Sequence, residues 1–124
     1  MSSAVPLMGR GDVFWVDLDP ARGSEANKTR PAVIVSNNGV QSTVFKRGRG
    51  VVTVVPVTSN VSYIYPFQAL ILAAEHPGLR SDSKAQAEQV RSVDVSRIGK
   101  RITTLTTATM RDLEAALRVH LALT

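Results

Sequence analysis

The sequence predicts a mainly β protein, in which a small curled antiparallel sheet or barrel is closed by one C-terminal helix. Three observations lead to this fold class. Short runs of β-branched and aromatic residues follow one another closely along most of the chain. Apolar residues recur at clear helical spacing only near the C-terminus. The 124 residues contain no internal repeat, low-complexity segment or linker, so we expect one domain over residues 1–124.

The first predicted strand covers residues 11–17. Val13 and Trp15 fall on one face of this strand, and Phe14 and Val16 fall on the other. Large apolar residues on both faces predict a strand that is covered on both sides. We therefore expect Trp15 to pack in the core.

A long polar loop separates this strand from the next. The loop spans residues 18–30 and carries cations, a carboxylate and hydroxyls, and a second strand follows over residues 31–36. Polar loops on a rigid sheet are common places for binding and catalytic groups. Residues 37–39, Asn-Asn-Gly, predict a turn, and residues 41–50 predict a flexible basic loop.

Three further strands are expected in the middle of the chain. Residues 51–58 are nearly all apolar and predict a central strand, although Pro56 indicates an edge or bulge near its end. Residues 67–72 predict a fourth strand, and a turn follows at residues 75–78. Partial alternation over residues 84–93 predicts a fifth strand.

The C-terminal part is expected to contain a short strand and the long helix. Residues 94–98 predict a helical turn that ends at Gly99, and residues 101–105 predict the last strand. Thr107 is the expected N-cap of the helix. The apolar residues at helical spacing are Met110, Leu113, Leu117 and Leu121.

Charge and composition limit the function classes. Lys and Arg number 15 against 10 Asp and Glu, so the net charge of +5 favours an anionic partner such as nucleic acid or an acidic protein. The absence of cysteine excludes disulfides, thiolate metal sites and cysteine nucleophiles. The N-terminus lacks a signal-peptide pattern, and no apolar run is long enough to span a bilayer. We expect a soluble cytoplasmic protein with no membrane partner and with flexible residues 1–9.

Metal and nucleotide-cofactor chemistry have little support in the sequence. The two histidines, His76 and His120, lie far apart, and no carboxylate cluster resembles a Mg²⁺ or Ca²⁺ site. A glycine-rich phosphate loop and a G-x-S-x-G nucleophile elbow are both absent. We therefore expect no metal and no cofactor, and structural roles for both histidines.

The remaining polar residues suit acid–base and electrostatic catalysis on a phosphodiester. Such a site requires a guanidinium to neutralise the phosphorane, donors that hold the phosphate, and groups that move protons. Arg30 supplies the cation, and Thr58 and Ser59 supply donors at the end of a buried strand. Glu25 and Glu88 are the carboxylates in polar surroundings. With an RNA 2′-hydroxyl as nucleophile, no activated water is needed.

These residues lie in segments that resemble the MazF/PemK/Kid family, the toxin half of bacterial type II toxin–antitoxin pairs. The resemblance extends from Gly11 to about Leu123 and consists of five ordered blocks. The blocks are residues 11–20, residues 23–25 with 29–36, residues 54–59, residues 65–67 and residues 87–93.

The resemblance implies the MazF/Kid/CcdB-type toxin fold, which is a strongly bent antiparallel sheet of SH3-like barrel type with a terminal helix. It also implies a homodimer that cleaves single-stranded RNA, in particular mRNA, sequence-specifically and without a metal. Cleavage in this family leaves a 2′,3′-cyclic phosphate and a 5′-hydroxyl. A cognate antitoxin inhibits the toxin, and an acidic, partly disordered antitoxin segment would suit a basic groove.

Two positions match functional residues of the family directly. Arg30, just before Pro31, matches the catalytic arginine, and Thr58 matches the residue that holds the scissile phosphate. Some relatives have a loop histidine where this chain has Ser24, so Glu25 is the expected base. The expected substrate-binding residues are Ser59, Lys28, Glu88, Gln89 and Arg91.

Two other functions remain open on the sequence alone. A gyrase poison of the related fold binds a protein target and cleaves no RNA. Similar poisons use a C-terminal aromatic residue, and the last residues here, 120–124, include none. A catalytically silent SH3-like module would bind RNA without forming cyclic phosphates.

Overall fold

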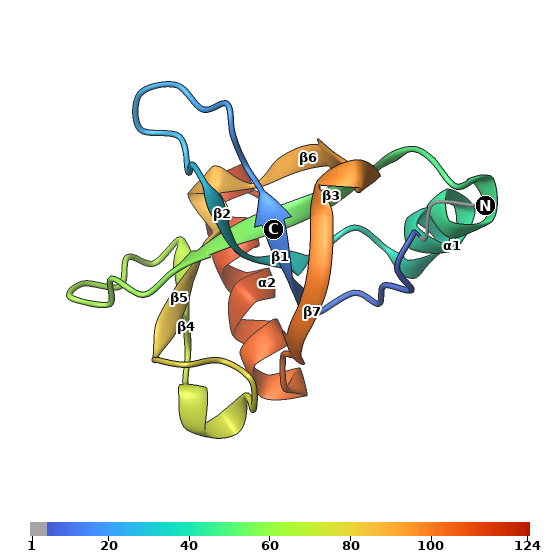
Figure 1. Ribbon diagram of the computed structural model, residues 1–124. Helices are drawn as coiled ribbons and strands as arrows, with labels where there is room; N and C mark the ends of the chain where they lie inside the picture. Colours follow the sequence, from blue (N-terminus) through green and yellow to red (C-terminus); the bar gives the residue numbers. More distant parts are fainter. Residues whose placement is uncertain (1–4) are drawn as a thin grey trace.

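An antiparallel sheet of seven strands and a C-terminal helix form the fold in residues 5–124, which the structure, a computed structural model, describes (Figure 1). The strands are β1 (Asp12–Asp17), β2 (Thr29–Ile34), β3 (Val51–Thr58), β4 (Gln68–Ile71), β5 (Ser83–Gln86), β6 (Arg91–Asp94) and β7 (Ile98–Thr104). The helices are α1 (Asn38–Arg47) and α2 (Thr107–Leu121). Short 3₁₀ turns are η1 (Ala73–Glu75), η2 (Ala87–Gln89) and η3 (Val95–Arg97).

Strand β3 lies at the centre of the sheet. The strand order is β4-β5-β3-β2-β1-β7, and β6 also pairs with β3. Residues 51–54 of β3 pair with β6, and residues 57–58 pair with β5. Pro56 lies between these two stretches, opposite Ala32 of β2. Pro56 therefore occupies a central strand where β3 changes partner, and not the predicted edge position.

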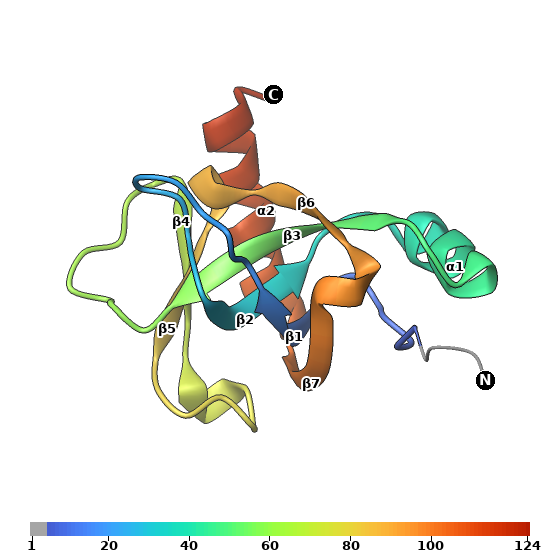
Figure 2. The same ribbon diagram turned by 45° about the horizontal axis from the view of Figure 1, so that its top comes forward.

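The sheet is open. Strands β4 and β7 are its two ends, and no strand pairing joins them within the described residues. Helix α2 packs against β4 and η2, while α1 and the β3–β4 loop lie at opposite ends of the molecule (Figures 1 and 2). The predicted mainly β fold with a C-terminal helix is confirmed, without closure of the sheet into a complete barrel.

The three central strands, β1, β2 and β3, bury side chains on both faces. Val13, Val33 and Val55 belong to one apolar cluster, which α2 completes with Leu113. The residues of the alternate positions form a second cluster, whose largest members include Phe14, Val16, Leu18, Ile34 and Val54. The predicted coverage of the first strand on both sides is confirmed for these positions.

Trp15 does not follow the prediction of a core position. Its side chain shares a face with Val13, but 42% of its surface is exposed. It lies opposite Pro31 of β2 and lines a cleft instead of packing in the first cluster. Strand alternation determines the face of a side chain, but it does not determine how far the core extends along the strand.

Helix α1 occupies most of the segment that was expected to be a flexible basic loop, residues 41–50. The Asn37 side chain caps it with a hydrogen bond of 3.0 Å from a backbone N–H of the first turn. Gly48 ends it in the left-handed conformation, with φ of 69°. Only Gln41 and Val44 of the helix are buried, so its sequence lacks the apolar stripe that predicts a helix.

The predicted fifth strand, residues 84–93, consists of β5 and β6 with η2 between them. The two strands pair with different parts of β3, and the intervening turn allows this change. Ala87 of the turn is fully buried, while Glu88 and Gln89 follow on the same turn. Alternation alone does not reveal such a break.

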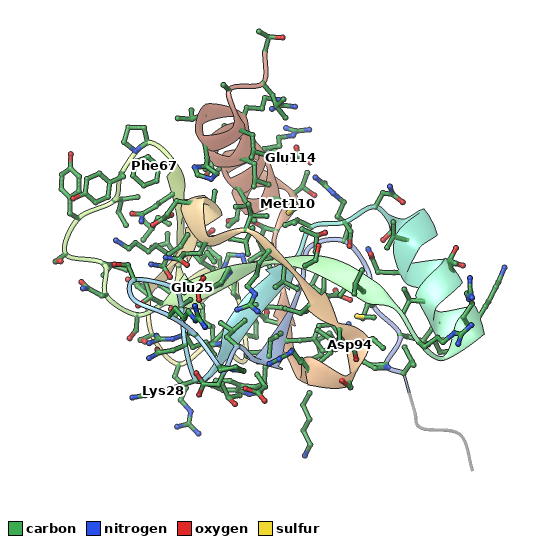
Figure 3. All side chains as sticks on the ribbon, turned by 90° about the horizontal axis from the view of Figure 1, so that it is seen from above. Glu25, Lys28, Phe67, Asp94, Met110 and Glu114 are labelled. Carbon is green, nitrogen blue, oxygen red and sulfur yellow. The ribbon has the colours of Figure 1, made fainter. Side chains whose placement is uncertain are left out.

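The elements after β6 differ from the prediction by a few residues. η3 is the predicted helical turn, and hydrogen bonds from Ser96 to its capping residue Asp94 hold the pKa of that carboxyl below its ordinary value. Strand β7 begins at Ile98 instead of residue 101, and Thr106 caps α2 instead of Thr107. Asp94 lies toward the α1 end of the molecule and Phe67 lies at the opposite end (Figure 3).

The N-terminal segment predicted to be flexible, residues 1–9, lies partly outside the described residues. Val5 and Met8 pack against the second cluster. The backbone N–H of Gly9 donates a hydrogen bond of 2.8 Å to Asp12 Oδ2. Among the described residues, no helix has the length and apolar character needed to cross a membrane.

Candidate active site

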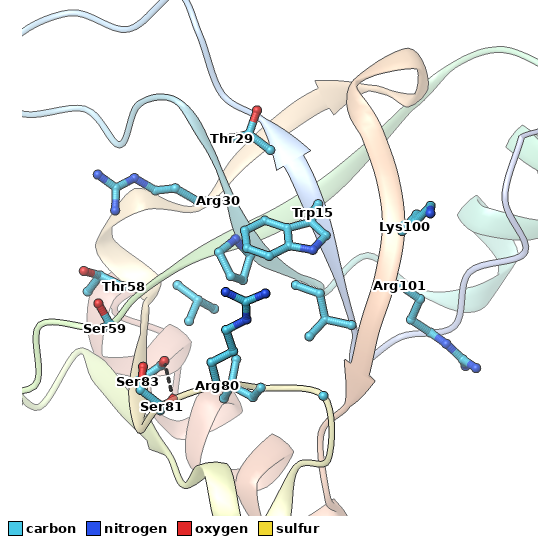
Figure 4. A pocket seen from close by; sticks show the side chains of 15 residues that line it. Trp15, Thr29, Arg30, Thr58, Ser59, Arg80, Ser81, Ser83, Lys100 and Arg101 are labelled. Atoms are coloured by element: carbon cyan, nitrogen blue, oxygen red, sulfur yellow. Dashed lines mark hydrogen bonds between the residues drawn. The ribbon is translucent and has the colours of Figure 1, made fainter.

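A cleft of about 490 Å³ opens beside β2, at the end of β3 (Figure 4). β1 and β7 contribute one wall, and the loop before β5 contributes another. Arg30, Thr58 and Ser59 all line this cleft. Three of the residues that the sequence singled out are therefore brought together in one place.

The charged side chains that line the cleft are all cationic. They are Arg30, Arg80, Lys100 and Arg101, and the 15 lining residues include no aspartate or glutamate. Arg80 reaches into the cleft, whereas Arg101 points away from it, toward Asp12 at 4.0 Å (Figure 4). A cleft with cations and no carboxylates concentrates anions.

Arg30 enters the cleft because of its place in the sheet. The pairing of β2 with β3 ends at Ala32 and Pro56, so Arg30 and Thr58 each lie two residues beyond this last pair, at the same end of the two strands. Arg30 Nε donates to Asn27 O at 2.7 Å, and Nη2 donates to Asn27 Oδ1 at 3.1 Å. A guanidinium carries five N–H groups, so a held Arg30 still has donors for a phosphate.

Thr58 and Ser59 supply hydroxyl groups on the same side of the cleft (Figure 4). Thr58 is half-buried at the end of β3, where it pairs with Lys84 of β5. Its Oγ1 accepts a hydrogen bond of 3.3 Å from Asn60 N–H, which leaves the hydroxyl proton for a ligand. Ser59 is exposed next to it.

Glu25 and Lys28 lie on the loop between β1 and β2, outside the residues that line the cleft (Figure 3). Glu25 Oε1 accepts a hydrogen bond of 2.6 Å from Arg22 N–H and closes the tip of the loop. Lys28 has a positive φ of 64°, and its backbone N–H donates to Asp19 Oδ1 at 2.9 Å. Both side chains are exposed.

Gln89 and Arg91 form hydrogen bonds with the loop between β1 and β2. Gln89 Oε1 accepts from Ala26 N–H at 3.0 Å, and Gln89 Nε2 donates to Ser24 O at 2.9 Å. Arg91 Nη1 donates to Leu18 O at 3.2 Å. These contacts position the loop, and neither side chain lines the cleft. Their contact with RNA stays a prediction.

Glu88 is half-buried and only partly satisfied. Its Oε2 accepts a hydrogen bond of 2.7 Å from Gln68 Nε2, while Oε1 is buried without a hydrogen-bond partner in the structure. An unsatisfied buried carboxylate oxygen is uncommon in folded proteins, because buried polar atoms usually have a hydrogen-bond partner. Glu88 also lies outside the cleft lining.

The sequence did not indicate Trp15, Arg80 or Lys100 as site residues, although all three line the cleft. Trp15 was assigned to the core from its strand position. Arg80 follows a turn, and Lys100 lies at an edge strand, so neither residue belongs to a pattern that sequence periodicity detects.

The histidine in the turn has the structural role that was expected. His76 is fully buried, and its Nδ1 lies 2.8 Å from Leu72 O. Its Nε2 accepts a hydrogen bond of 3.1 Å from Thr106 N–H, so the ring joins η1 to the start of α2. No group of three or more His, Cys, Asp or Glu residues in the described part of the chain is arranged to hold a metal ion.

Comparisons with known proteins identify the family. Residues 9–121 match the PemK-like, MazF-like toxin of type II toxin–antitoxin systems. The chain is 53% identical over 117 residues to endoribonuclease MazF9 of Mycobacterium tuberculosis, with 94% of this chain and 98% of that protein covered. It is 29% identical over 117 residues to endoribonuclease EndoA of Bacillus subtilis, with 94% and 97% covered.

Solved structures share the fold. MazF from Deinococcus radiodurans superposes with a TM-score of 0.78 at 23% identity, covering 94% of this chain and 98% of that chain. A mycobacterial endoribonuclease in complex with its cognate antitoxin has a TM-score of 0.70 at 24% identity, covering 94% and 97%. The chain belongs to the PemK-like, MazF-like toxin family, as the resemblance predicted.

Proposed function

We propose that this protein is a sequence-specific, metal-independent endoribonuclease toxin that cleaves single-stranded RNA, in particular mRNA. The observation that carries the proposal is the cleft in which Arg30, Thr58 and Ser59 meet without any carboxylate among the lining residues. Such a cleft suits the scissile phosphate of a polyanion, where negative charge increases during the reaction. Relatives that are 53% and 29% identical are named endoribonucleases, which supports the same activity here.

The proposed reaction is a transesterification within the RNA. The 2′-oxygen forms a bond to the neighbouring phosphorus, and the bond from phosphorus to the 5′-oxygen of the next nucleotide breaks. The products are a 2′,3′-cyclic phosphate and a 5′-hydroxyl. Arg30 stabilises the charge that gathers on the phosphorane, and Thr58 and Ser59 donate hydrogen bonds that fix its oxygens.

Two protons must move in this reaction, one from the 2′-hydroxyl and one to the departing 5′-oxygen. We assign the first to Glu25, whose carboxylate lies at the tip of a polar loop beside β2. Because Glu25 does not line the cleft, this role requires the loop to move toward the bound phosphate. The departing 5′-oxygen takes its proton from solvent water, and Arg30 stabilises its negative charge as it leaves.

The remaining predicted residues are assigned to RNA binding around the cleft. Lys28 and Glu25 share the exposed loop, which Gln89 and Arg91 hold in place. Glu88 is assigned to this group by the family resemblance, and its buried Oε1 would have to become accessible before a nucleotide could donate to it. In this arrangement the loop covers the RNA while the sheet fixes the scissile phosphate.

Arg30→Ala tests the proposal in the presence of a metal chelator. We expect cleavage of a mixed RNA pool to fall by at least about 100-fold, because the main stabiliser of the phosphorane charge is lost. The control is Arg118→Ala, which removes an exposed arginine from α2, outside the cleft. Near-normal cleavage by Arg30→Ala, or loss of wild-type cleavage with chelator, would contradict the mechanism.

Glu25→Gln tests the proton acceptor separately. We expect kcat to fall about 100-fold, because the amide cannot accept the proton. The amide oxygen keeps the hydrogen bond from Arg22 N–H, so the loop remains closed. An unchanged kcat would assign the base elsewhere. Sequencing the 5′-hydroxyl ends of the products gives the recognised RNA sequence.

A cognate antitoxin with an acidic segment is the proposed protein partner. The chain has a net charge of +5, and the cleft carries cations without carboxylates. Electrostatic attraction of this kind weakens as salt screens the charges. Affinity measured across a salt series should fall steadily, and indifference to salt would speak against an electrostatic contact.

A further inference from the structure

We infer that the cleft also holds a nucleotide adjacent to the scissile phosphate, with its base against Trp15 and its phosphate at Arg80. This subsite rests on the proposed RNA cleavage and adds a binding position to it. Trp15 and Arg80 line the same cleft as Arg30 and Thr58. In Figure 4 Arg80 extends into the cleft from the loop before β5, and Trp15 faces the cleft from β1.

Arg80 is a cation with no partner in the described part of the protein. Its side chain makes no hydrogen bond or ion pair there, and no carboxylate lines the cleft around it. Arg30, in contrast, is already held by two hydrogen bonds to Asn27. The cleft therefore presents two separate guanidinium groups, which suits two phosphates more than one.

The backbone beside Arg80 is firmly placed. Gly78 has φ of 102°, and a Cβ on it would lie 2.2 Å from Ile102 O, so the turn lies directly against β7. Leu79 N–H donates to His76 O at 3.1 Å, and the Leu79 side chain packs against the first cluster. Arg80 is thus presented from a fixed turn, although its own side chain is free.

Trp15 offers a flat apolar surface at the same place. It is the only tryptophan of the chain, and 42% of its surface is exposed. Its neighbours restrain its backbone, since Pro31 lies opposite it and Gly99 approaches its carbonyl closely. Unpaired RNA bases stack on aromatic side chains of this kind, whereas a free inorganic anion would not use the ring.

The size of the cleft fits this occupant. A volume of about 490 Å³ lies in the range of small-molecule sites and exceeds what one phosphate group needs. A protein partner is less suited, because the combination of an indole face and an unpaired guanidinium matches a base and its phosphate. The cleft therefore suits one nucleotide of the bound RNA strand.

Trp15 fluorescence provides a test that does not depend on cleavage. The probe is a single-stranded RNA that spans a mapped cleavage site and carries 2′-deoxyribose at the cleaved nucleotide, which removes the nucleophile. We expect the wild-type protein to show a change in Trp15 fluorescence on binding. Replacing the base by an abasic nucleotide on each side in turn should remove this change at one side only.

Arg80→Ala tests the phosphate contact with the same probe. We expect about tenfold weaker binding, and a salt dependence of log K less steep by about 0.7, the value for one lost phosphate contact on a single strand. KM for cleavable RNA should rise while kcat stays close to wild type, unlike Arg30→Ala. Arg118→Ala is the matched control and should behave as wild type.

The outcomes separate the subsite from the proposed function. If wild-type protein cleaves RNA, but Arg80→Ala keeps wild-type affinity and salt slope, the subsite is wrong and the nuclease proposal stands. A wild-type fluorescence signal that no abasic position removes would also overturn the subsite. If the wild-type protein cleaves no RNA, both proposals fail together.

Discussion

At the scale of single residues, the main chemical feature is that Arg30 is oriented before any substrate arrives. Two N–H groups of Arg30 donate hydrogen bonds to Asn27, one to its backbone carbonyl and one to its side-chain oxygen. Thr58 lies at the end of the neighbouring strand β3, two residues beyond its last pair with β2, and lines the same cleft. Neighbouring strands therefore carry the backbones of the two groups most important to the proposed reaction, and Asn27 of the β1–β2 loop orients the Arg30 side chain.

Thr58→Val removes the hydroxyl while keeping a β-branched side chain of similar shape. We expect kcat to fall about 100-fold, because one donor to the phosphorane is lost. Thr58→Ser keeps the hydroxyl and should retain most of the activity. Both variants should be measured on the mapped RNA site, with thermal unfolding as the check on folding. Equal activity of the two variants would remove Thr58 from the mechanism.

The sequence predicted part of the site at this scale. Thr58 and Ser59 lie where the predicted central strand ends, whereas Arg30 belongs to β2, which begins at Thr29, and not to the predicted loop of residues 18–30. Glu25 and Lys28 lie outside the cleft because the β1–β2 loop folds away from it, and Gln89 of η2 and Arg91 of β6 hydrogen-bond to that loop instead of lining the cleft. No local pattern encodes that folding.

At the scale of elements, the loop between β1 and β2 is held by side chains from a distant part of the chain. Gln89 bonds it at two points, Ala26 N–H and Ser24 O. Without RNA, a loop fixed in this way keeps a defined shape although most of it is exposed, and the proposed movement of Glu25 toward the phosphate breaks these two bonds. The two bonds make the turn η2 a support for a loop that precedes it by about sixty residues.

Gln89→Ala should loosen this loop. We expect the Ala26 amide to exchange its hydrogen about five to ten times faster, because a hydrogen bond of about 1 kcal/mol is lost. KM for RNA should rise with it. Ser92→Ala, an exposed position on β6, is the control and should leave both unchanged. An unchanged Ala26 exchange rate would show that the loop holds its shape without Gln89.

The turn before β5 depends on a glycine. Gly78→Ala should reduce the free energy of unfolding by about 3 kcal/mol, because φ of 102° strains an alanine and its Cβ would approach Ile102 O to 2.2 Å. Gly23→Ala is the control, since φ there is 55° and nothing lies within 4 Å of its Cβ. We expect a loss of about 1 kcal/mol for the control. Equal losses in chemical denaturation would contradict this account.

The elements that the sequence predicted well have strong local patterns. β1, β3 and α2 bury nearly continuous apolar runs or a helical stripe, so periodicity identifies them. α1 has few buried residues, and the break between β5 and β6 is imposed by β3. These two features depend on tertiary packing, which sequence periodicity does not contain.

At the scale of the whole molecule, we expect two chains to associate. The family resemblance implies a homodimer, and the end of α2 with the residues after it carries exposed apolar side chains, Val119, Leu121 and Leu123, with 55%, 48% and 59% of their surfaces exposed. Sedimentation equilibrium at micromolar concentration should give about twice the chain mass of 13.4 kDa. A mass equal to one chain under these conditions would contradict the prediction.

The burial of the three central strands on both faces has a consequence for how the protein melts. Val33 and Ile34 are neighbours on one strand, yet they belong to different apolar clusters. The same strands contribute side chains to both clusters. If one cluster unfolds, these strands lose their fixed conformation, and the other cluster unfolds with it. Heat or denaturant should disrupt both sides, and the cleft with them, in a single cooperative step.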